Sequence, residues 1–497
     1  MIKYVSTRDP KLCVSSSKAI LSGQAEGGGL FVPEDLDEIR CDYHDVIKSG
    51  TDFRSMAKAV WDLFFDDYGT EKIDDLVERS YKDKFSAEEI TPLVKVKGAA
   101  NDAYVLELYH GPTSAFKDVA LSALPNLLTA SREMNGFEDD IMILTATSGD
   151  TGSAAIAGFS DVPGTAITVF FPHGGVSDTQ RLQMVTAAGS NVTACAIRGN
   201  FDDAQTGVKK IFRECPRPAD GVSLSSANSI NIGRLVPQIV YYFSAYAQLL
   251  ADGSIKDGDK VDYVVPTGNF GDIMAGYFAL KMGLPVGRLV CASNKNDVLT
   301  EFLETGHYDR RREFFKTTSP SMDILVSSNL ERLLYYVCGA ENTLKYMKQL
   351  EETGEYSITD AELAGIKEVF TGIYANDDEG AKAIRDVFEA DHYLMDTHTS
   401  IAWACMNKYR ASADGDPAAT VVLSTASPYK FSAAVLEALG EELTGSDEGN
   451  MKKVREITGA PVPSGLAGIF SRPVLHNDVI DISDMRAYVV EKCTNQG

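Results

Sequence analysis

The sequence predicts an α/β fold in which parallel strands alternate with crossover helices. Three short apolar or β-branched runs, at residues 141–145, 166–171 and 261–266, are each followed by a polar or glycine-rich turn and then by apolar residues at helical spacing. This alternation is typical of a parallel sheet covered by helices. The chain has 497 residues, too many for one compact core, because single cores stop growing near ~250–300 residues. We therefore expect two open α/β lobes with room for a cleft between them.

Changes in composition divide the chain further. Residues 1–95 include an amphipathic stretch near 53–68 and are assigned to a small N-terminal domain. The two lobes are expected at 96–225 and 226–497. Within the second lobe, a charged stretch at about 298–390 has Glu, Lys and Leu at helical spacing, which predicts a helical insertion.

Charge and cysteine content exclude several classes of function. A formal net charge of -24 argues against a broad surface for nucleic acid or anionic membrane, since such partners need clustered Lys and Arg. The most apolar run, 235–251, is interrupted by Pro237, Gln238 and Gln248 and predicts a buried helix rather than a membrane span. The eight cysteines include no CxxC pair, so we expect reduced thiols and no metal site. The first thirty residues lack the pattern of a secretory signal, and the cytoplasm is the expected location.

A lysine follows one of the expected strands. Residues 108–118, LYHGPTSAFKD, place Lys117 just beyond the strand and beside Phe116. A lone lysine is usually a solvated charge. An amine walled off from water, however, has a lowered pKa and can attack an aldehyde. Lys117 is therefore a candidate nucleophile whose role depends on the other motifs.

Two further strand-to-helix junctions could bind anions. Residues 145–155, TATSGDTGSAA, gather hydroxyl groups at a helix start, which is either an ordinary N-cap or a turn that binds an amino-acid carboxylate. Residues 266–273, PTGNFGDI, place Gly268 and Gly271 where backbone N–H groups could converge on a phosphate. Glycine turns of this kind are also common as purely structural features. The spacing differs from that of a GKT or GKS loop, which argues against a nucleoside triphosphatase.

Together and in this order, HGPTSAFKD, TSGDTG and GNFGDI resemble the lysine motif, the substrate-carboxylate loop and the phosphate cup of the fold type II pyridoxal-phosphate (PLP) enzymes. The resemblance is closest to the threonine synthase family in its long, bacterial and fungal branch. SSANSINIGRLVPQ at 225–238 and STASPYKF at 424–431 extend the similarity over most of the chain from about Gly27 onward. Five ordered motifs are far more specific than any single glycine loop.

The resemblance implies a PLP cofactor and a role for each motif. It makes Lys117 the Schiff-base lysine and places Thr425 opposite the pyridine nitrogen, where a neutral hydroxyl leaves the ring less electron-withdrawing than a carboxylate would. The implied ligands of the cofactor's phosphate are Gly268, Asn269, Phe270, Gly271 and Asp272. The implied substrate-binding residues are Thr147, Ser148, Asp150 and Thr151 for the carboxylate end, and Asn228, Ser229 and Arg234 for the phosphate end.

The implied enzyme is a PLP-dependent carbon–oxygen lyase acting on phosphates, which converts O-phospho-L-homoserine and water to L-threonine and phosphate. A PLP-dependent phospholyase that releases phosphate and a 2-oxo acid from the same substrate class is the alternative. A catalytically silent PLP-binding module is a more distant one. The partner is thus a small molecule, and the protein is expected to be a monomer or a small homo-oligomer. Ser427, where many members have His, and the absence of an Arg after the glycines of PHGGVS at 172–177 depart from the family pattern.

Overall fold

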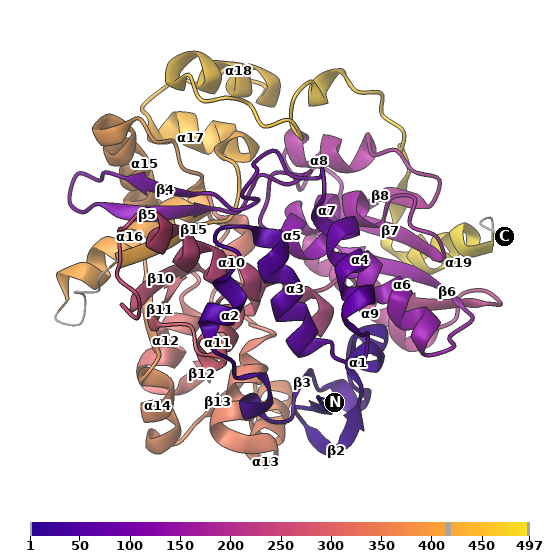
Figure 1. The fold of residues 1–497 in the computed structure, drawn as a ribbon. Coiled ribbons are helices and arrows are strands. Elements are labelled where there is room, and N and C mark those ends of the chain that lie inside the picture. Colours follow the sequence, from indigo (N-terminus) through magenta and orange to yellow (C-terminus); the bar gives the residue numbers. More distant parts are fainter. Residues whose placement is uncertain (1, 413–418, 495–497) are drawn as a thin grey trace.

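A computed structural model describes residues 2–412 and 419–494 and builds them around two sheets that stand side by side (Figure 1). The six-stranded sheet is parallel except for the antiparallel pair β4–β5. Its order is β14 (Phe370–Tyr374), β11 (Val286–Ser293), β10 (Val261–Pro266), β15 (Ala419–Ser424), β5 (Ala103–Glu107) and β4 (Leu93–Val96). The five-stranded sheet is parallel throughout. Its order is β16 (Val479–Asp481), β8 (Val192–Arg198), β7 (Thr165–Pro172), β6 (Asp140–Ala146) and β9 (Val222–Ser225).

The three runs that predicted strands form β6, β7 and β10, and helices connect and cover the two sheets. Around the five-stranded sheet lie α5 (Lys117–Leu121), α6 (Leu124–Met134), α7 (Asp150–Phe159), α8 (Asp178–Val185), α9 (Phe201–Glu214) and α19 (Met485–Thr494). The helices associated with the six-stranded sheet are α10 (Ile232–Ala251), α11 (Gly271–Met282), α15 (Asp377–Asp391), α16 (Thr397–Ala411), α17 (Ser432–Ala438) and α18 (Asp447–Thr458). The expected α/β class is therefore confirmed.

Sheet membership crosses the boundaries expected from the sequence at two places. Strand β5, which precedes Lys117, pairs with β15 as well as with its sequence neighbour β4, so it belongs to the six-stranded sheet and not to the sheet of β6 and β7. Strand β16, near the end of the chain, pairs with β8 in the five-stranded sheet. The division at 95 and 225 stays a prediction: the six-stranded sheet includes β4 and β5 from before residue 225, and the five-stranded sheet includes β16 from after it.

The described part of the N-terminal region forms a small antiparallel sheet and four α-helices. The sheet has the order β2 (Asp9–Val14), β1 (Tyr4–Ser6) and β3 (Phe31–Pro33). The helices are α1 (Ser16–Ser22), α2 (Tyr43–Ile47), α3 (Phe53–Phe64) and α4 (Thr70–Tyr81). The apolar face of α3, including Trp61, is buried, as the amphipathic pattern near 53–68 indicates.

The stretch at about 298–390 is helix-rich, as expected, but it also carries strands. It contains α12 (Val298–Thr305), β12 (His307–Asp309), α13 (Leu330–Glu352), β13 (Glu355–Ser357), α14 (Asp360–Lys367), β14 and α15. β12 and β13 form a separate antiparallel pair, whereas β14 is an edge strand of the six-stranded sheet. The insertion is thus joined to the six-stranded sheet through β14.

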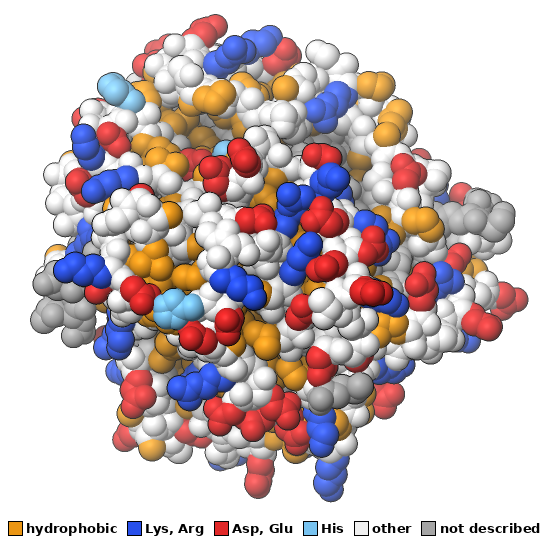
Figure 2. Space-filling view, in the orientation of Figure 1, with side chains coloured by type: hydrophobic (Ala, Val, Ile, Leu, Met, Phe, Trp, Pro, Cys, Tyr) orange, Lys and Arg blue, Asp and Glu red, His pale blue; other side chains and the backbone are white. Residues whose placement is uncertain are grey.

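The central helix α10 forms much of the core. Nearly all of its residues are buried, so the apolar run at 235–251 is confirmed as a buried helix. No helix among the described residues is long and apolar enough to cross a membrane. All eight cysteines are free, and four of them are buried. Acidic and basic side chains are interspersed over the face shown in Figure 2.

Truncating a buried side chain of α10 to alanine should lower the free energy of unfolding far more than the same change in a surface helix. Ile239 is fully buried in α10, so Ile239→Ala should cost about 2–5 kcal/mol through lost burial and a residual cavity. Ile457 in α18 is 38% exposed, and Ile457→Ala should cost less than about 1 kcal/mol. Urea unfolding of the two variants would measure the difference; equal losses would contradict the placement of α10 in the core.

Candidate active site

Lys117 opens helix α5 and lies half-buried at the end of the loop that follows β5. Its Nζ lies 3.3 Å from Ser321 Oγ, which belongs to the loop before α13. Burial lowers the pKa of Lys117 to about 8. The positive charges of Lys430 and Arg234 act in the same direction, against the opposing effect of Asp150. Lys117 therefore has the lowered pKa expected of a nucleophilic amine.

The loop before Lys117 is fixed by buried hydrogen bonds. The Asp118 carboxylate accepts from the Thr113 backbone N–H at 2.8 Å and from the Thr113 hydroxyl at 2.6 Å. A Cβ at Gly111 would lie 2.4 Å from Asp118 Cβ, so this close turn requires glycine. Lys430 Nζ donates to the Thr113 carbonyl at 2.9 Å. Asp118, Thr113 and Lys430 thus hold the lysine loop in one conformation.

A buried ion pair joins this loop to the start of α7. Lys430 Nζ lies 2.9 Å from Asp150 Oδ1, and both side chains are almost fully buried. Burial alone would raise the pKa of Asp150, but the nearby Lys430 ammonium holds that pKa well below its usual range. Gln180 donates a further hydrogen bond to Asp150 at 3.0 Å. Lys430 lies within STASPYKF, but nothing local to that motif predicts its pairing with the distant Asp150.

In the TSGDTG loop, two of the predicted substrate-binding side chains are bonded to other groups of the protein. Thr147 Oγ1 accepts from the N–H groups of Gly149 at 3.0 Å and Gly152 at 2.9 Å. Asp150 is committed to the ion pair just described. Gly149 has a φ of 143°, and a Cβ there would lie 2.4 Å from Gln180. Ser148 is exposed and Thr151 is half-buried, so these two hydroxyls are the ones open to a ligand.

The GNFGDI loop is a tight cradle at the N-terminus of α11. Phe270 adopts a left-handed conformation with a φ of 62° and precedes Gly271, the first residue of the helix. A Cβ at Gly268 would lie 2.5 Å from the Ser321 carbonyl oxygen. Asn269 accepts at its carbonyl from both the backbone N–H and the side-chain amide of Asn329, at 3.0 and 2.9 Å. The backbone N–H groups at this helix start form the kind of site that binds phosphate.

Two buried charged side chains near the cradle each keep one polar atom without a partner among the described residues. Asp272 accepts hydrogen bonds from Tyr241 and, at 3.1 Å, from Tyr242, yet its Oδ2 has no partner among the described residues. Burial raises the pKa of Asp272 to about 7. Arg234 Nη1 donates to the Ala227 carbonyl at 2.7 Å, whereas its buried Nε has no partner within residues 2–412 and 419–494. An unpaired guanidinium donor beside a glycine-lined helix start fits a phosphorylated ligand.

The NSINIGR segment lies against the same cradle. The Asn329 amide donates to the Ser229 hydroxyl at 3.2 Å, and the Thr145 hydroxyl lies 3.4 Å from Asn228 Oδ1. The buried Arg332 donates to Asn329, to the Ile230 carbonyl and, at 3.1 Å, to the Phe31 carbonyl of β3. Arg332, which sequence reasoning missed, therefore ties the small N-terminal sheet to this part of the site.

The end of β15 completes the site. Thr425 is buried, and its carbonyl accepts from the Phe116 N–H at 2.8 Å, next to Lys117. The Ser427 N–H donates to the Ser114 carbonyl at 3.1 Å, and the Ser427 hydroxyl caps the short turn that follows. In PHGGVS, Ser177 caps helix α8. Ser427 thus has a structural role at the position where the sequence departs from the family pattern.

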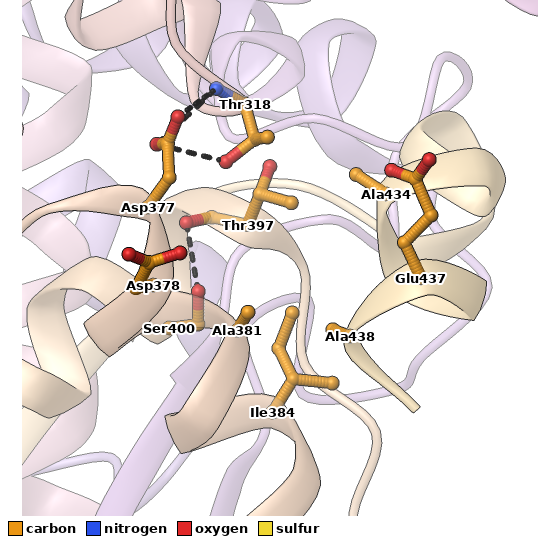
Figure 3. A pocket seen from close by; sticks show the side chains of 10 residues that line it. All are labelled: Thr318, Asp377, Asp378, Ala381, Ile384, Thr397, Ser400, Ala434, Glu437 and Ala438. Atoms are coloured by element: carbon orange, nitrogen blue, oxygen red, sulfur yellow. Dashed lines mark hydrogen bonds between the residues drawn. The ribbon is translucent and has the colours of Figure 1, made fainter. Parts of the chain in front are cut away.

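A cavity of about 190 Å³ lies outside this cluster (Figure 3). It is lined by residues of α15, α16 and α17 and by Thr318. The Asp377 carboxylate accepts from the Thr318 hydroxyl at 3.1 Å, and the Ser400 hydroxyl donates to the Thr397 carbonyl at 2.9 Å. Lys117 does not line it, so the cavity is separate from the predicted site residues.

Comparisons with known proteins define the class of this enzyme. The family profile described as pyridoxal-phosphate dependent enzyme matches residues 85–426, which include every motif named above except the end of STASPYKF. This is a PLP-dependent enzyme. Profiles for the threonine synthase N terminus and the threonine synthase C-terminal region match residues 3–81 and 399–489. The chain belongs to the threonine synthase family.

Individual relatives agree with this assignment. Threonine synthase of Saccharomyces cerevisiae is 37% identical, over 88% of this chain and 89% of that protein. Threonine synthase-like 1 of Homo sapiens is 36% identical over 88% of this chain, which spans 60% of that longer protein. The crystal structure of PLP-bound threonine synthase from Brucella melitensis is 36% identical, with a TM-score of 0.87 and 99% of both chains covered. The expected fold type II architecture and PLP cofactor are confirmed.

Loss of the Lys430 charge should destabilise the protein. Lys430→Met would leave the Asp150 carboxylate buried without its partner, at a cost of about 3–5 kcal/mol. Asp150→Asn in the same chain should recover part of that loss, because the amide carries no charge. Thermal unfolding of the single and double variants at pH 7 would test this, and a double variant no more stable than Lys430→Met would contradict it.

Proposed function

We propose that this enzyme converts O-phospho-L-homoserine and water to L-threonine and phosphate, with Lys117 as the Schiff-base lysine. One observation carries the proposal. The Lys117 amine contacts Ser321, whose carbonyl packs against Gly268 of the α11 cradle, and the nearby charge of Arg234, whose Nε is unpaired among the described residues, helps to lower the pKa of Lys117. Such a site offers one amine and separate groups for anions.

The residues present fit PLP. The N–H groups along 268–272 are suited to its phosphate, and Asp272 takes part through its main chain while its carboxylate stays with Tyr241 and Tyr242. Thr425 is the proposed partner of the pyridine nitrogen. When bound, PLP withdraws electrons from the substrate carbon that carries the amine and so eases removal of protons there.

Lys117 is suited to carry those protons. With a pKa of about 8, its amine exists in both protonation states near neutral pH and can both accept and return a proton. The surrounding charges have opposing effects on the pKa of Lys117: Asp150 and Asp118 favour the ammonium, while Lys430 and Arg234 favour the neutral amine. The fixed loop 111–116 keeps the lysine backbone in place while its side chain moves.

The proposed substrate contacts divide between two ends. Arg234, Asn228 and Ser229 would bind the substrate phosphate, since an arginine can make two charge-assisted hydrogen bonds and stabilise the leaving group. Ser148 and Thr151 would bind the carboxylate. Thr147 and Asp150 would then act mainly by holding the TSGDTG turn, because their side chains are already bonded within the protein.

A phospholyase that releases a 2-oxo acid would need the same residues, and product analysis separates the two reactions. The PLP-loaded protein is incubated with O-phospho-L-homoserine while phosphate, threonine and 2-oxobutyrate are measured together. Threonine formed in step with phosphate is the expected result, and 2-oxobutyrate in its place would establish the phospholyase.

Lys117→Ala should lose both the visible absorbance of bound cofactor and turnover; a variant with undiminished turnover would refute the role of Lys117.

Arg234→Leu should impair use of the phosphorylated substrate more than retention of PLP. The change removes the unpaired Nε and the guanidinium charge, so we expect kcat/KM to fall by about 10²-fold or more, equivalent to about 3 kcal/mol. Cofactor retention, followed by absorbance after gel filtration, should stay near the wild-type level. Loss of both together would make Arg234 a structural residue.

We also propose that the enzyme works in the cytoplasm, as a monomer or a small homo-oligomer, on a small-molecule substrate alone. Light scattering of the purified protein would determine the oligomeric state.

A further inference from the structure

Ser321 lies where three parts of the site meet. Its hydroxyl is 3.3 Å from Lys117 Nζ, and this is the hydrogen bond that the Lys117 amine makes within the described part of the chain. Its carbonyl oxygen packs against Gly268, where a Cβ would approach it to 2.5 Å. Its backbone N–H donates to His398 Nε2 at 3.1 Å. One residue therefore touches the lysine, the phosphate cradle and a buried histidine.

The histidine is held in a single tautomer. Because Nε2 accepts from the Ser321 N–H, it carries no proton, and Nδ1 must be the protonated nitrogen. Nδ1 lies 2.6 Å from Asp396 Oδ2 and donates to it. Asp396 is fully buried and also caps α16 by accepting from the Thr399 N–H at 3.0 Å. His398 is therefore a rigid acceptor anchored to the start of a long helix.

The loop around Ser321 needs such an anchor. Between β12 and α13 it forms only the single turn Pro320–Met322. A polar cluster fixes the base of the loop: the side-chain amides of Asn294 and Asn296 donate to Asp323 Oδ1 at 2.8 and 2.9 Å. At Ser321 itself, the backbone N–H is held by His398.

We propose that Ser321 is a catalytic residue that holds the Lys117 amine whenever the lysine is not covalently attached, and that His398 and Asp396 are positioning residues acting through the Ser321 main chain. The inference deepens the proposed function, since it rests on Lys117 being the Schiff-base lysine. While Lys117 is attached, the covalent bond fixes its end. Once displaced, its flexible side chain has many rotamers in which the amine leaves the reactive geometry. A hydrogen bond at Nζ opposes that loss of orientation.

A hydroxyl suits this task better than a charged group. It accepts a hydrogen bond from the ammonium and donates one to the neutral amine, so it holds Lys117 in both protonation states. The charged groups that face Lys117 are Asp150, Asp118, Lys430 and Arg234. Their effects on the amine oppose one another, and both carboxylates are bonded elsewhere. Ser321 is left as the direct partner of the amine.

The contact can be tested without turnover, in the cofactor-free protein. Trace acetylation from pH 6 to 10, with Lys117 quantified by mass spectrometry, reports the pKa of its amine. The wild-type midpoint should lie near pH 8. Ser321→Ala removes a bond that is stronger to the charged ammonium than to the neutral amine, so its midpoint should fall by about one pH unit. Thr318→Ala is the matched control, because Thr318 lies in the same loop but bonds to Asp377 and should keep the wild-type midpoint.

Measurements on the PLP-loaded protein test the catalytic consequence. Ser321→Ala should retain cofactor and its visible absorbance, because covalent attachment does not need the serine, while kcat falls about 10- to 100-fold. His398→Leu should reproduce the fall in kcat, and His398→Gln, whose side-chain carbonyl can still accept from the Ser321 N–H, should restore at least half of the lost activity. Wild-type labelling and kcat in Ser321→Ala would overturn the proposal, as would a Gln variant as impaired as the Leu variant.

The outcomes distinguish this inference from the proposed function. If Lys117→Ala kept cofactor and turnover, the role of Lys117 would fail, yet the labelling shift in Ser321→Ala would still establish the Ser321–Lys117 contact. If Lys117→Ala lost both and the labelling midpoint did not move, Ser321 alone would lose its role. A His398→Leu variant that failed to fold would leave the decision to Ser321→Ala.

Discussion

The buried ion pair between Lys430 and Asp150 is the interaction on which the rest of the site depends. Lys430 follows β15 of the six-stranded sheet, and Asp150 follows β6 of the five-stranded sheet, so a single contact of 2.9 Å spans the two lobes. Lys430 also bonds to Thr113 in the loop that presents Lys117. Because two charges removed from water must be paired, this contact strongly constrains how the lobes approach one another around the lysine.

The anion-binding parts are organised by a second set of buried bonds. Asn329 bonds to Asn269 in the cradle and to Ser229 in the NSINIGR segment, while Arg332 extends the link to β3 in the N-terminal region. The glycines at 268 and 271 let the backbone come close enough for these contacts. The small N-terminal sheet therefore supports the site directly, although none of the predicted ligands belongs to it.

Most charged groups around Lys117 are bonded to other groups of the protein, so the site is ordered before a ligand binds. Asp118, Asp150 and Lys430 shape the loops and set the pKa of the amine, yet their polar atoms are committed to protein partners. The groups left for a ligand include the cradle N–H groups, the Arg234 Nε, and the hydroxyls of Ser148 and Thr151. A site built in this way holds its shape before a ligand arrives, which lowers the cost of orienting a substrate.

The sequence by itself determined the fold class, the family and the motifs. Strands β6, β7 and β10 and helix α10 could be predicted because their signals are local, arising from β-branched runs and from the spacing of apolar residues. The same holds for Gly268 and Gly271, where a glycine turn between strand and helix is legible without any partner. Only the tertiary structure decided which side chains are free to act. Thr147 and Asp150 look like ligands in the sequence but are bonded within the protein, and Lys430, Arg332, Ser321 and His398 gain their roles from residues far away in the chain. The physical reason is that a hydrogen bond or an ion pair depends on distance in space, which local sequence patterns do not encode.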